Sequence, residues 1–197
     1  MRDGDRLVGF IRHAATAWNA EHRIQGHTDV PLSAEGRASL AGCRLPADLL
    51  PATWFVSPLA RARETAELLG IVEARVEPRL IEMSFGEWEG LTTKEIRARE
   101  PRGGGPLGLR PPGGESSEEV VARLAAFLRS EAGRKGPFGA VTHLGIVRAA
   151  LELAHGWAMA RPTPEEIHWD RAHLFLLGED GRLRPHALNV PFAREAG

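Results

Sequence analysis

The sequence predicts an α/β fold, a three-layer α/β/α sandwich in which helices cover both faces of a mostly parallel central sheet. Short, continuous apolar runs of strand length alternate along the chain with segments whose apolar residues recur at helical spacing. Continuous apolar runs are typical of strands that are covered on both faces, which usually means a parallel sheet. Strands that alternate with helices favour a layered arrangement of this kind.

Four apolar runs are expected to be strands, and three further segments are expected to be helices. The strands, in chain order, are Leu7 to Ile11, Thr53 to Val56, Phe138 to Thr142 and Leu174 to Leu177. The helices each have one face at helical spacing, and these faces are Ala62, Thr65, Ala66 and Leu69, then Val120, Leu124, Phe127 and Leu128, then Val147, Ala150, Leu151 and Ala154. Ser116 and Glu119 have the spacing of a capping box, so the second helix should begin there.

The length of 197 residues predicts one domain, residues 1–197, because domains average ~150 residues.

One segment interrupts the alternation of expected strands and helices. Residues 101–114 read PRGGGPLGLRPPGG, which is too rich in Gly and Pro for regular structure, so we expect a long loop, either a mobile lid or an insertion. Three glycines in it have the spacing of a dinucleotide fingerprint, but no strand precedes them, which excludes that reading.

The composition excludes several classes of protein. With 25 basic and 26 acidic residues, the chain lacks the basic excess of a nucleic-acid binder. No apolar run approaches the ~20 residues of a membrane span. A single cysteine, Cys43, excludes an intramolecular disulfide and fits a reducing cytoplasm, where we expect the protein to be. Six histidines lack the spacing of a zinc site, and no metal or cofactor is expected.

Polar side chains follow the predicted strands directly. Arg12 and His13 follow the first strand, and His143 follows the third. Arg61 comes shortly after the second strand, and Glu82 follows an apolar pair that we expect to end another strand. Each residue alone would most often be a solvated polar group. Because the carboxyl ends of parallel strands meet at one edge of a sheet, the five together predict an active site there.

The chemistry of this set suits phosphoryl transfer. A histidine beside arginines stays neutral, which leaves a ring nitrogen free to attack. Two guanidiniums grip a tetrahedral oxyanion through bidentate hydrogen bonds. A glutamate that is repelled by a bound dianion stays protonated long enough to act as an acid. Phosphoryl transfer needs little beyond positioning and charge neutralisation, so no metal is required.

Six motifs occur in a fixed order along the chain. The first is FIRHAATAWN, residues 10–19, and the others are residues 23–36, 57–66, 82–90, 112–116 and 142–143. In type and order these motifs resemble those of the histidine phosphatase superfamily, also called the phosphoglycerate mutase-like family. The resemblance extends from Phe10 to Arg148 and implies that family's fold.

The resemblance also implies roles for individual residues. His13 would be the nucleophile and form a phosphohistidine, and Glu82 would protonate the leaving oxygen. The phosphate pocket would be formed by five side chains, namely Arg12, Thr16, Asn19, Arg61 and His143. The second histidine would be protonated in the complex and act as a cation.

Three positions depart from the family pattern. Ala14 and Leu144 stand where the family has glycine, and Ala15 stands where it often has glutamate. A leucine adds bulk beside the phosphate pocket and could narrow the substrate cleft. No reacting group is lost, so the departures concern which substrate fits and whether the backbone at position 144 contacts phosphate.

The resemblance leaves the reaction open between a phosphatase and a mutase. Related mutases carry a longer insertion before the second histidine and a C-terminal tail over the pocket. Here 60 residues separate Glu82 from His143, and seven follow Val190. We therefore expect a metal-independent phosphatase acting on a small phosphomonoester, with a cofactor-dependent phosphoglycerate mutase next and a non-catalytic phospholigand-binding module last. Sugar phosphates, a nucleotide-loop phosphate of cobalamin synthesis and phosphoglycerates all remain open, as does the oligomeric state.

Overall fold

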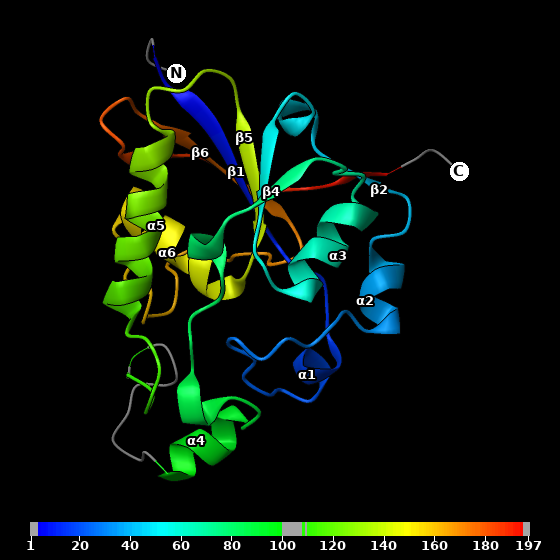
Figure 1. Cartoon of the computed structure of the whole chain (residues 1–197), viewed down its shortest axis with the longest axis vertical. Helices are drawn as coiled ribbons and strands as arrows, with labels where there is room; N and C mark the ends of the chain where they lie inside the picture. Colours follow the sequence, from blue (N-terminus) through cyan, green and yellow to red (C-terminus); the bar gives the residue numbers. More distant parts are fainter. Residues whose placement is uncertain (1–3, 100–107, 109, 195–197) are drawn as a thin grey trace.

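The computed structural model describes residues 4–99, 108 and 110–194, and its centre is a six-stranded sheet (Figure 1). In spatial order the strands are β4 (Ala74–Val76), β3 (Thr53–Val56), β5 (Phe138–Thr142), β1 (Arg6–Arg12), β6 (Ala172–Leu177) and β7 (Leu183–Val190). The first four pair in parallel, whereas β6 runs antiparallel to β1, and β7 antiparallel to β6. The predicted α/β fold with a mostly parallel sheet is confirmed.

Two expectations about the strands are corrected. The run Leu174–Leu177 lies in β6, which is antiparallel, although its continuous apolar sequence favoured a parallel strand. All six residues of β6 are buried, and burial on both faces produces the same composition whichever way a strand runs. Glu82 does not follow a strand. It follows a 3₁₀ turn, η2 (Pro78–Leu80), because Pro78 lacks the N–H that a central strand needs.

Helices cover both faces of the sheet (Figure 1). On one face lie α5 (Ser117–Glu131) and α6 (Leu144–His155), and on the other lie α2 (Ala34–Ser39) and α3 (Ala60–Leu68). Alternate residues of β1 serve the two layers, since Phe10 packs in the cluster under α5 and α6 whereas Ile11 packs in the cluster under α3. The capping box that was predicted before α5 is present, with Ser116 as the N-cap.

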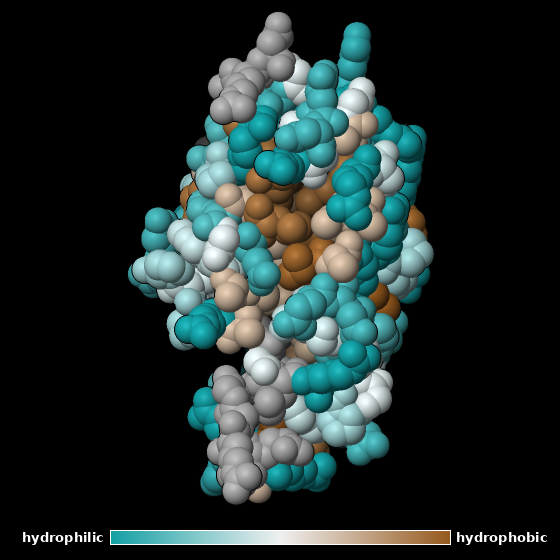
Figure 2. Space-filling model, turned by 90° about the vertical axis from the view of Figure 1, so that its left-hand side faces the viewer, coloured by the Kyte–Doolittle hydropathy of each residue, from teal (hydrophilic) through white to brown (hydrophobic). Residues whose placement is uncertain are grey.

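Figure 2 shows the side of the molecule on which α5 lies, where hydrophilic residues surround a central apolar area. Within the described residues, no helix is long and apolar enough to cross a membrane.

Shorter elements gather at the carboxyl edge of the parallel strands. They are α1 (Ala17–Ala20), η3 (Gly86–Trp88) and α4 (Thr93–Arg99), whereas η1 (Ala47–Leu49) leads into the amino end of β3. A separate two-stranded sheet is formed by β2 (Cys43–Arg44) and β8 (Ala193–Arg194). The segment after α1 is tied to the segment after η3, because Ile24 N donates to Leu91 O at 2.8 Å and Gly90 N to Ile24 O at 2.8 Å.

Most of the predicted loop at residues 101–114 lies outside the described residues, so its proposed role as a lid stays a prediction. Its last part is described and lies against the segment that carries Glu82. Glu87 N donates to Pro112 O at 3.0 Å, and Glu115 N donates to Ser84 O at 2.9 Å.

Candidate active site

The predicted residues meet at the carboxyl edge of the sheet. Arg12 ends β1, and His13 N donates to Thr142 O at 2.9 Å, which holds the loop after β1 against the end of β5. His143 follows β5 as the N-cap of α6, and the ring centroids of His13 and His143 lie 5.2 Å apart. Arg61 lies in the first turn of α3, shortly after β3. The strand ends therefore bring both histidines and both arginines together.

His13 is held as a neutral ring with one free nitrogen. Its Nδ1 lies 2.7 Å from Ala14 O, and because a carbonyl only accepts, Nδ1 carries the hydrogen and Nε2 the lone pair. Burial, then the charges of Arg12 and Arg61, hold the pKa of His13 well below its ordinary value of 6.5. A neutral imidazole with an available Nε2 is the state that a histidine nucleophile requires.

His143 is also buried among positive charges. Its Nε2 forms a 2.6 Å hydrogen bond with the hydroxyl of Ser57, and its buried Nδ1 has no partner among the described residues. Burial and the charge of Arg61 lower the pKa of His143 well below its ordinary value. A bound phosphate would contribute the opposite charge and favour the protonated ring, so the expected cationic role of His143 stays a prediction that depends on ligand binding.

Arg12 and Arg61 each have a buried guanidinium nitrogen without a hydrogen-bond partner among the described residues. Arg61 is fully buried, and its guanidinium donates to Thr28 O at 2.9 Å and to Gly26 O at 2.7 Å. The Nε atoms of Arg61 and Arg12 are buried without a partner among the described residues. Burial is the main cause that lowers the pKa of both guanidiniums. Because buried donors are rarely left unpaired, these nitrogens indicate an oxyanion site.

Glu82 is positioned by backbone groups. Its Oε1 accepts hydrogen bonds from Met83 N at 2.8 Å and from Gly145 N, in the first turn of α6, at 3.1 Å. A Cβ atom on Gly145 would lie 2.3 Å from the same Oε1, so only glycine leaves room for the carboxyl group. The carbonyl oxygen of Glu82 accepts from Arg123 at 3.0 Å. The sequence predicted Glu82 but not Gly145 or Arg123.

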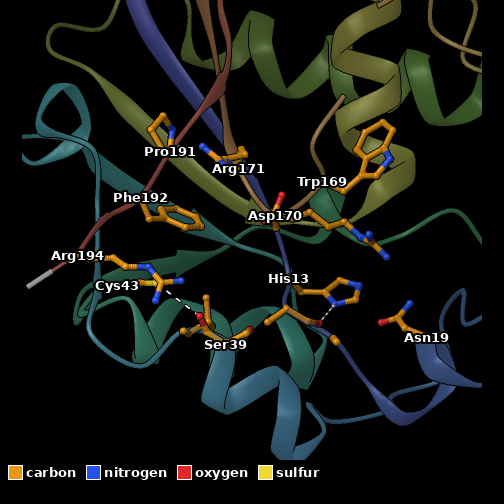
Figure 3. A pocket seen from close by; sticks show the side chains of 14 residues that line it. His13, Asn19, Ser39, Cys43, Trp169, Asp170, Arg171, Pro191, Phe192 and Arg194 are labelled. Carbon is orange, nitrogen blue, oxygen red and sulfur yellow. Dashed lines mark hydrogen bonds between the residues drawn. The ribbon is translucent and has the colours of Figure 1, made fainter. Parts of the chain in front are cut away.

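Asn19 and Thr16 have different environments. Asn19 lines a cleft beside His13 (Figure 3), and its Oδ1 accepts from Thr16 N at 3.0 Å, which leaves the side-chain nitrogen as a donor. Thr16 is fully buried as the N-cap of α1, and its hydroxyl bonds to Gln25 at 3.0 Å. Thr16 therefore positions Asn19, and its direct contact with phosphate stays a prediction.

The departures from the family pattern do not strain the backbone. Leu144 is the first residue of α6, and Ala14 has a negative φ, so neither position needs the conformational freedom of glycine. Ala14 N donates to the hydroxyl of Thr65 at 3.0 Å, which ties the loop after β1 to α3.

The cleft beside His13 has a volume of about 650 Å³ (Figure 3). The residues that line it are Arg12, His13, Ala14, Ala15, Asn19, Ser39, Leu40, Cys43, Trp169, Asp170, Arg171, Pro191, Phe192 and Arg194. The sequence suggested a tail too short to cover the pocket, but Pro191, Phe192 and Arg194 line this cleft. Within the described residues, no three side chains of His, Cys, Asp or Glu gather to hold a metal ion.

A sequence model of the histidine phosphatase superfamily (branch 1) matches residues 8–188. A 2,3-bisphosphoglycerate-dependent phosphoglycerate mutase of Gloeobacter violaceus is 35% identical over 76% of each chain. A glucosyl-3-phosphoglycerate phosphatase of Mycolicibacterium vanbaalenii is 33% identical over 80% of this chain and 72% of its own. The match to a probable phosphoglycerate mutase of Photorhabdus laumondii, 36% identical, covers 62% of this chain but only 61% of that protein.

Solved structures agree with these matches. The native structure of mycobacterial glucosyl-3-phosphoglycerate phosphatase superposes with a TM-score of 0.74 at 28% identity, over 94% of this chain and 99% of that one. The likeness therefore extends over nearly the whole chain. The chain belongs to the histidine phosphatase superfamily.

Proposed function

We propose that this protein is a metal-independent phosphatase that hydrolyses a small phosphomonoester through a phosphohistidine on His13. The observation that carries the proposal is the buried, neutral His13, whose Nδ1 is occupied by Ala14 O, beside arginine Nε atoms without partners. A nucleophile with one free nitrogen and unsatisfied donors for an oxyanion are the two parts that phosphoryl transfer needs.

In the first step, His13 Nε2 attacks phosphorus and the bond from phosphorus to the alcohol oxygen breaks. Glu82 transfers its proton to that oxygen as the electron pair moves onto it. In the second step, water attacks the phosphohistidine, the N–P bond breaks, and its electron pair returns to Nε2. Glu82 accepts the proton of the water, so inorganic phosphate leaves and both residues are restored.

A phosphoglycerate mutase is the second candidate, and one observation favours it. Members of the superfamily are phosphatases or mutases, and a mutase has to shield its phosphohistidine from water. Residues 191, 192 and 194 of the tail line the cleft beside His13, so the shortness of the tail no longer argues against a mutase. The segment between Glu82 and His143 still supports a phosphatase, because its 60 residues lack the longer insertion that related mutases carry there.

A phosphate-release panel tests the proposal. The panel contains glucosyl-3-phosphoglycerate, 3-phosphoglycerate, sugar phosphates and a nucleotide-loop phosphate, and 3-phosphoglycerate is also assayed for isomerisation with a bisphosphoglycerate primer. We expect release of inorganic phosphate without primer. Primer-dependent isomerisation with no phosphate release from any compound would establish the mutase instead.

Metal independence has its own measurement. Because arginines neutralise the transferring group, a chelator should leave the rate unchanged, whereas vanadate, a mimic of the pentacoordinate state, should inhibit. Loss of activity in chelator that a divalent ion restores would contradict this part of the proposal.

A further inference from the structure

Ser57 begins the motif at residues 57–66 and takes no part in the two proposed chemical steps. It directly follows β3 and is fully buried. Ser57 N donates to Val141 O at 3.0 Å, which fixes its backbone against β5. Its hydroxyl forms the 2.6 Å hydrogen bond with Nε2 of His143. A buried serine is therefore held directly beside the second histidine of the site.

The direction of this hydrogen bond follows from the surroundings of the Ser57 hydroxyl. The only other group that bonds to Oγ among the described residues is a donor, Leu59 N, at 3.4 Å. If the ring donated to Oγ, the buried hydroxyl hydrogen would have no acceptor, which is rare in proteins. The hydroxyl therefore donates to Nε2 of His143, and the single hydrogen of the neutral ring lies on Nδ1.

Nδ1 of His143 is one of three buried nitrogens of the site that have no partner among the described residues. The other two are the Nε atoms of Arg12 and Arg61. With its hydrogen on Nδ1, His143 offers a third donor, which a bound oxyanion would satisfy. With the hydrogen on Nε2, the same nitrogen would present a lone pair and repel an anion. The position of one hydrogen thus decides whether His143 supports phosphate binding.

The surroundings of His143 keep its ring neutral. The charged and titratable groups that face it are Arg12 and His13 at the end of β1, Arg61 of α3, Arg123 of α5 and the Glu82 carboxyl, which accepts from Gly145 N. Burial and then the charge of Arg61 hold the pKa of His143 well below its ordinary value of 6.5. A neutral ring has only one N–H, so the group that fixes its position controls which nitrogen can donate.

We infer that Ser57 is a positioning residue that holds His143 in the Nδ1–H tautomer, so that the neutral ring donates to the phosphoryl group without taking up a proton. The inference rests on the proposed function and adds a residue to that site. In contrast to the cationic role that the family resemblance implies for His143, this role needs no second hydrogen on the ring.

Nitrogen NMR of the free protein tests the tautomer directly. Spectra that correlate ring nitrogens with carbon-bound ring hydrogens distinguish a nitrogen that carries a hydrogen from one that does not. The signals of His143 are those that a His143→Gln variant lacks. At neutral pH we expect the hydrogen on Nδ1 in the parent. In Ser57→Ala it should move to Nε2, which carries the hydrogen in most free histidine side chains.

The affinity for inorganic phosphate, measured by calorimetry between about pH 8 and about pH 5, tests the consequence. Near pH 8, the parent should bind phosphate about 10-fold or more tightly than Ser57→Ala, because the variant lacks one charge-assisted donor. As the pH falls, the His143 ring becomes protonated and both nitrogens carry hydrogen without Ser57, so the ratio of the two affinities should approach one. Protonation of phosphate itself cancels in this ratio.

Ser130→Ala is the matched control. The Ser130 hydroxyl donates to Phe127 O at 2.7 Å within α5, so its removal should leave the phosphate affinity of the parent unchanged at every pH. A merely structural role of Ser57 would lower the affinity by the same factor at every pH.

Four outcomes would overturn the inference. They are a hydrogen on Nε2 of His143 in the parent, an affinity ratio near one at every pH, a ratio that does not change with pH, and an equal loss in Ser130→Ala. Failure of the proposed function looks different. The parent would then release no phosphate from any ester, while NMR of the free protein would still decide the tautomer.

Discussion

The phosphate pocket and the cleft beside His13 present their arginines in different ways. In the phosphate pocket, Arg61 is fully buried, and two Nε atoms are buried without partners among the described residues. In the cleft, Arg171 is half-buried and Arg194 is exposed. Buried and fixed donors stabilise charge that develops in a transition state, because they need no reorganisation. Exposed cations contribute mainly to binding. The difference indicates that the buried donors of the phosphate pocket are better suited than the exposed cations to stabilise a transition state.

The pocket and the cleft also differ in how the fold supports them. Arg12 ends β1, His13 and His143 follow β1 and β5, and Arg61 lies in the first turn of α3. The cleft residues Arg171 and Arg194 come from the start of β6 and from β8. Substitution of Arg194 should therefore have little effect on the fold, whereas substitution in the phosphate pocket should change the rate for every substrate.

The largest effect is expected at His13. Removing a covalent nucleophile typically lowers kcat by ~10⁶-fold, so His13→Ala should abolish turnover of every phosphomonoester, with or without a carboxylate. Steady-state kinetics on both classes of substrate measures this, and circular dichroism checks the fold. Turnover of either class near the parent rate would remove His13 from the mechanism.

Glu82 and Gly145 should act as one unit. General acid catalysis contributes ~10²–10⁴-fold, and Glu82→Gln should lose most of that factor on an alkyl phosphate but far less on p-nitrophenyl phosphate, whose leaving group needs no proton. Gly145→Ala should show the same dependence on leaving group, because the added methyl group would lie 2.3 Å from the Glu82 Oε1. The double variant should be no worse than Glu82→Gln. Equal losses on both substrates, or additive losses, would assign both residues to folding.

Arg61 and Arg194 sharpen the comparison between the phosphate pocket and the cleft. Charge-assisted hydrogen bonds contribute ~1.5–3 kcal/mol, so Arg61→Ala should cost at least ~10-fold in kcat/KM, and phosphate should bind it less well. Arg12→Ala should behave in the same way. Arg194→Gln should keep the phosphate affinity of the parent, because Arg194 is exposed on β8. If Arg61→Ala bound phosphate like the parent, the phosphate pocket would be misplaced.

A smaller effect concerns pH. Burial, Arg12 and Arg61 lower the pKa of His13, so its proton leaves at lower pH and the nucleophile stays neutral below pH 6.5. The acid limb of kcat/KM should therefore lie below pH 6.5, and Arg61→Gln should move it to higher pH by removing one cause of the shift. A pH–rate profile of both proteins measures this. A limb at pH 6.5 that Arg61→Gln leaves in place would contradict the assignment.

The sequence predicted the parts of the site that depend on local order. His13 and His143 could be placed because a strand end is visible in the chain, and Ser116 because a capping box is local. What it missed depends on contacts between distant segments. The room that Gly145 leaves for Glu82 follows from packing, and the place of Phe192 and Arg194 in the cleft that His13 also lines follows from the pairing of β8 with β2. The antiparallel direction of β6 was missed because composition records burial and not direction.

Rapid quench with a phosphate-labelled substrate tests the central claim most directly. A histidine nucleophile should yield a phosphoenzyme that is labile in acid and stable in base, with the label on the peptide that contains His13, and the His13→Ala variant should carry none. An acid-stable label, or a labelled His13→Ala variant, would contradict covalent catalysis at His13.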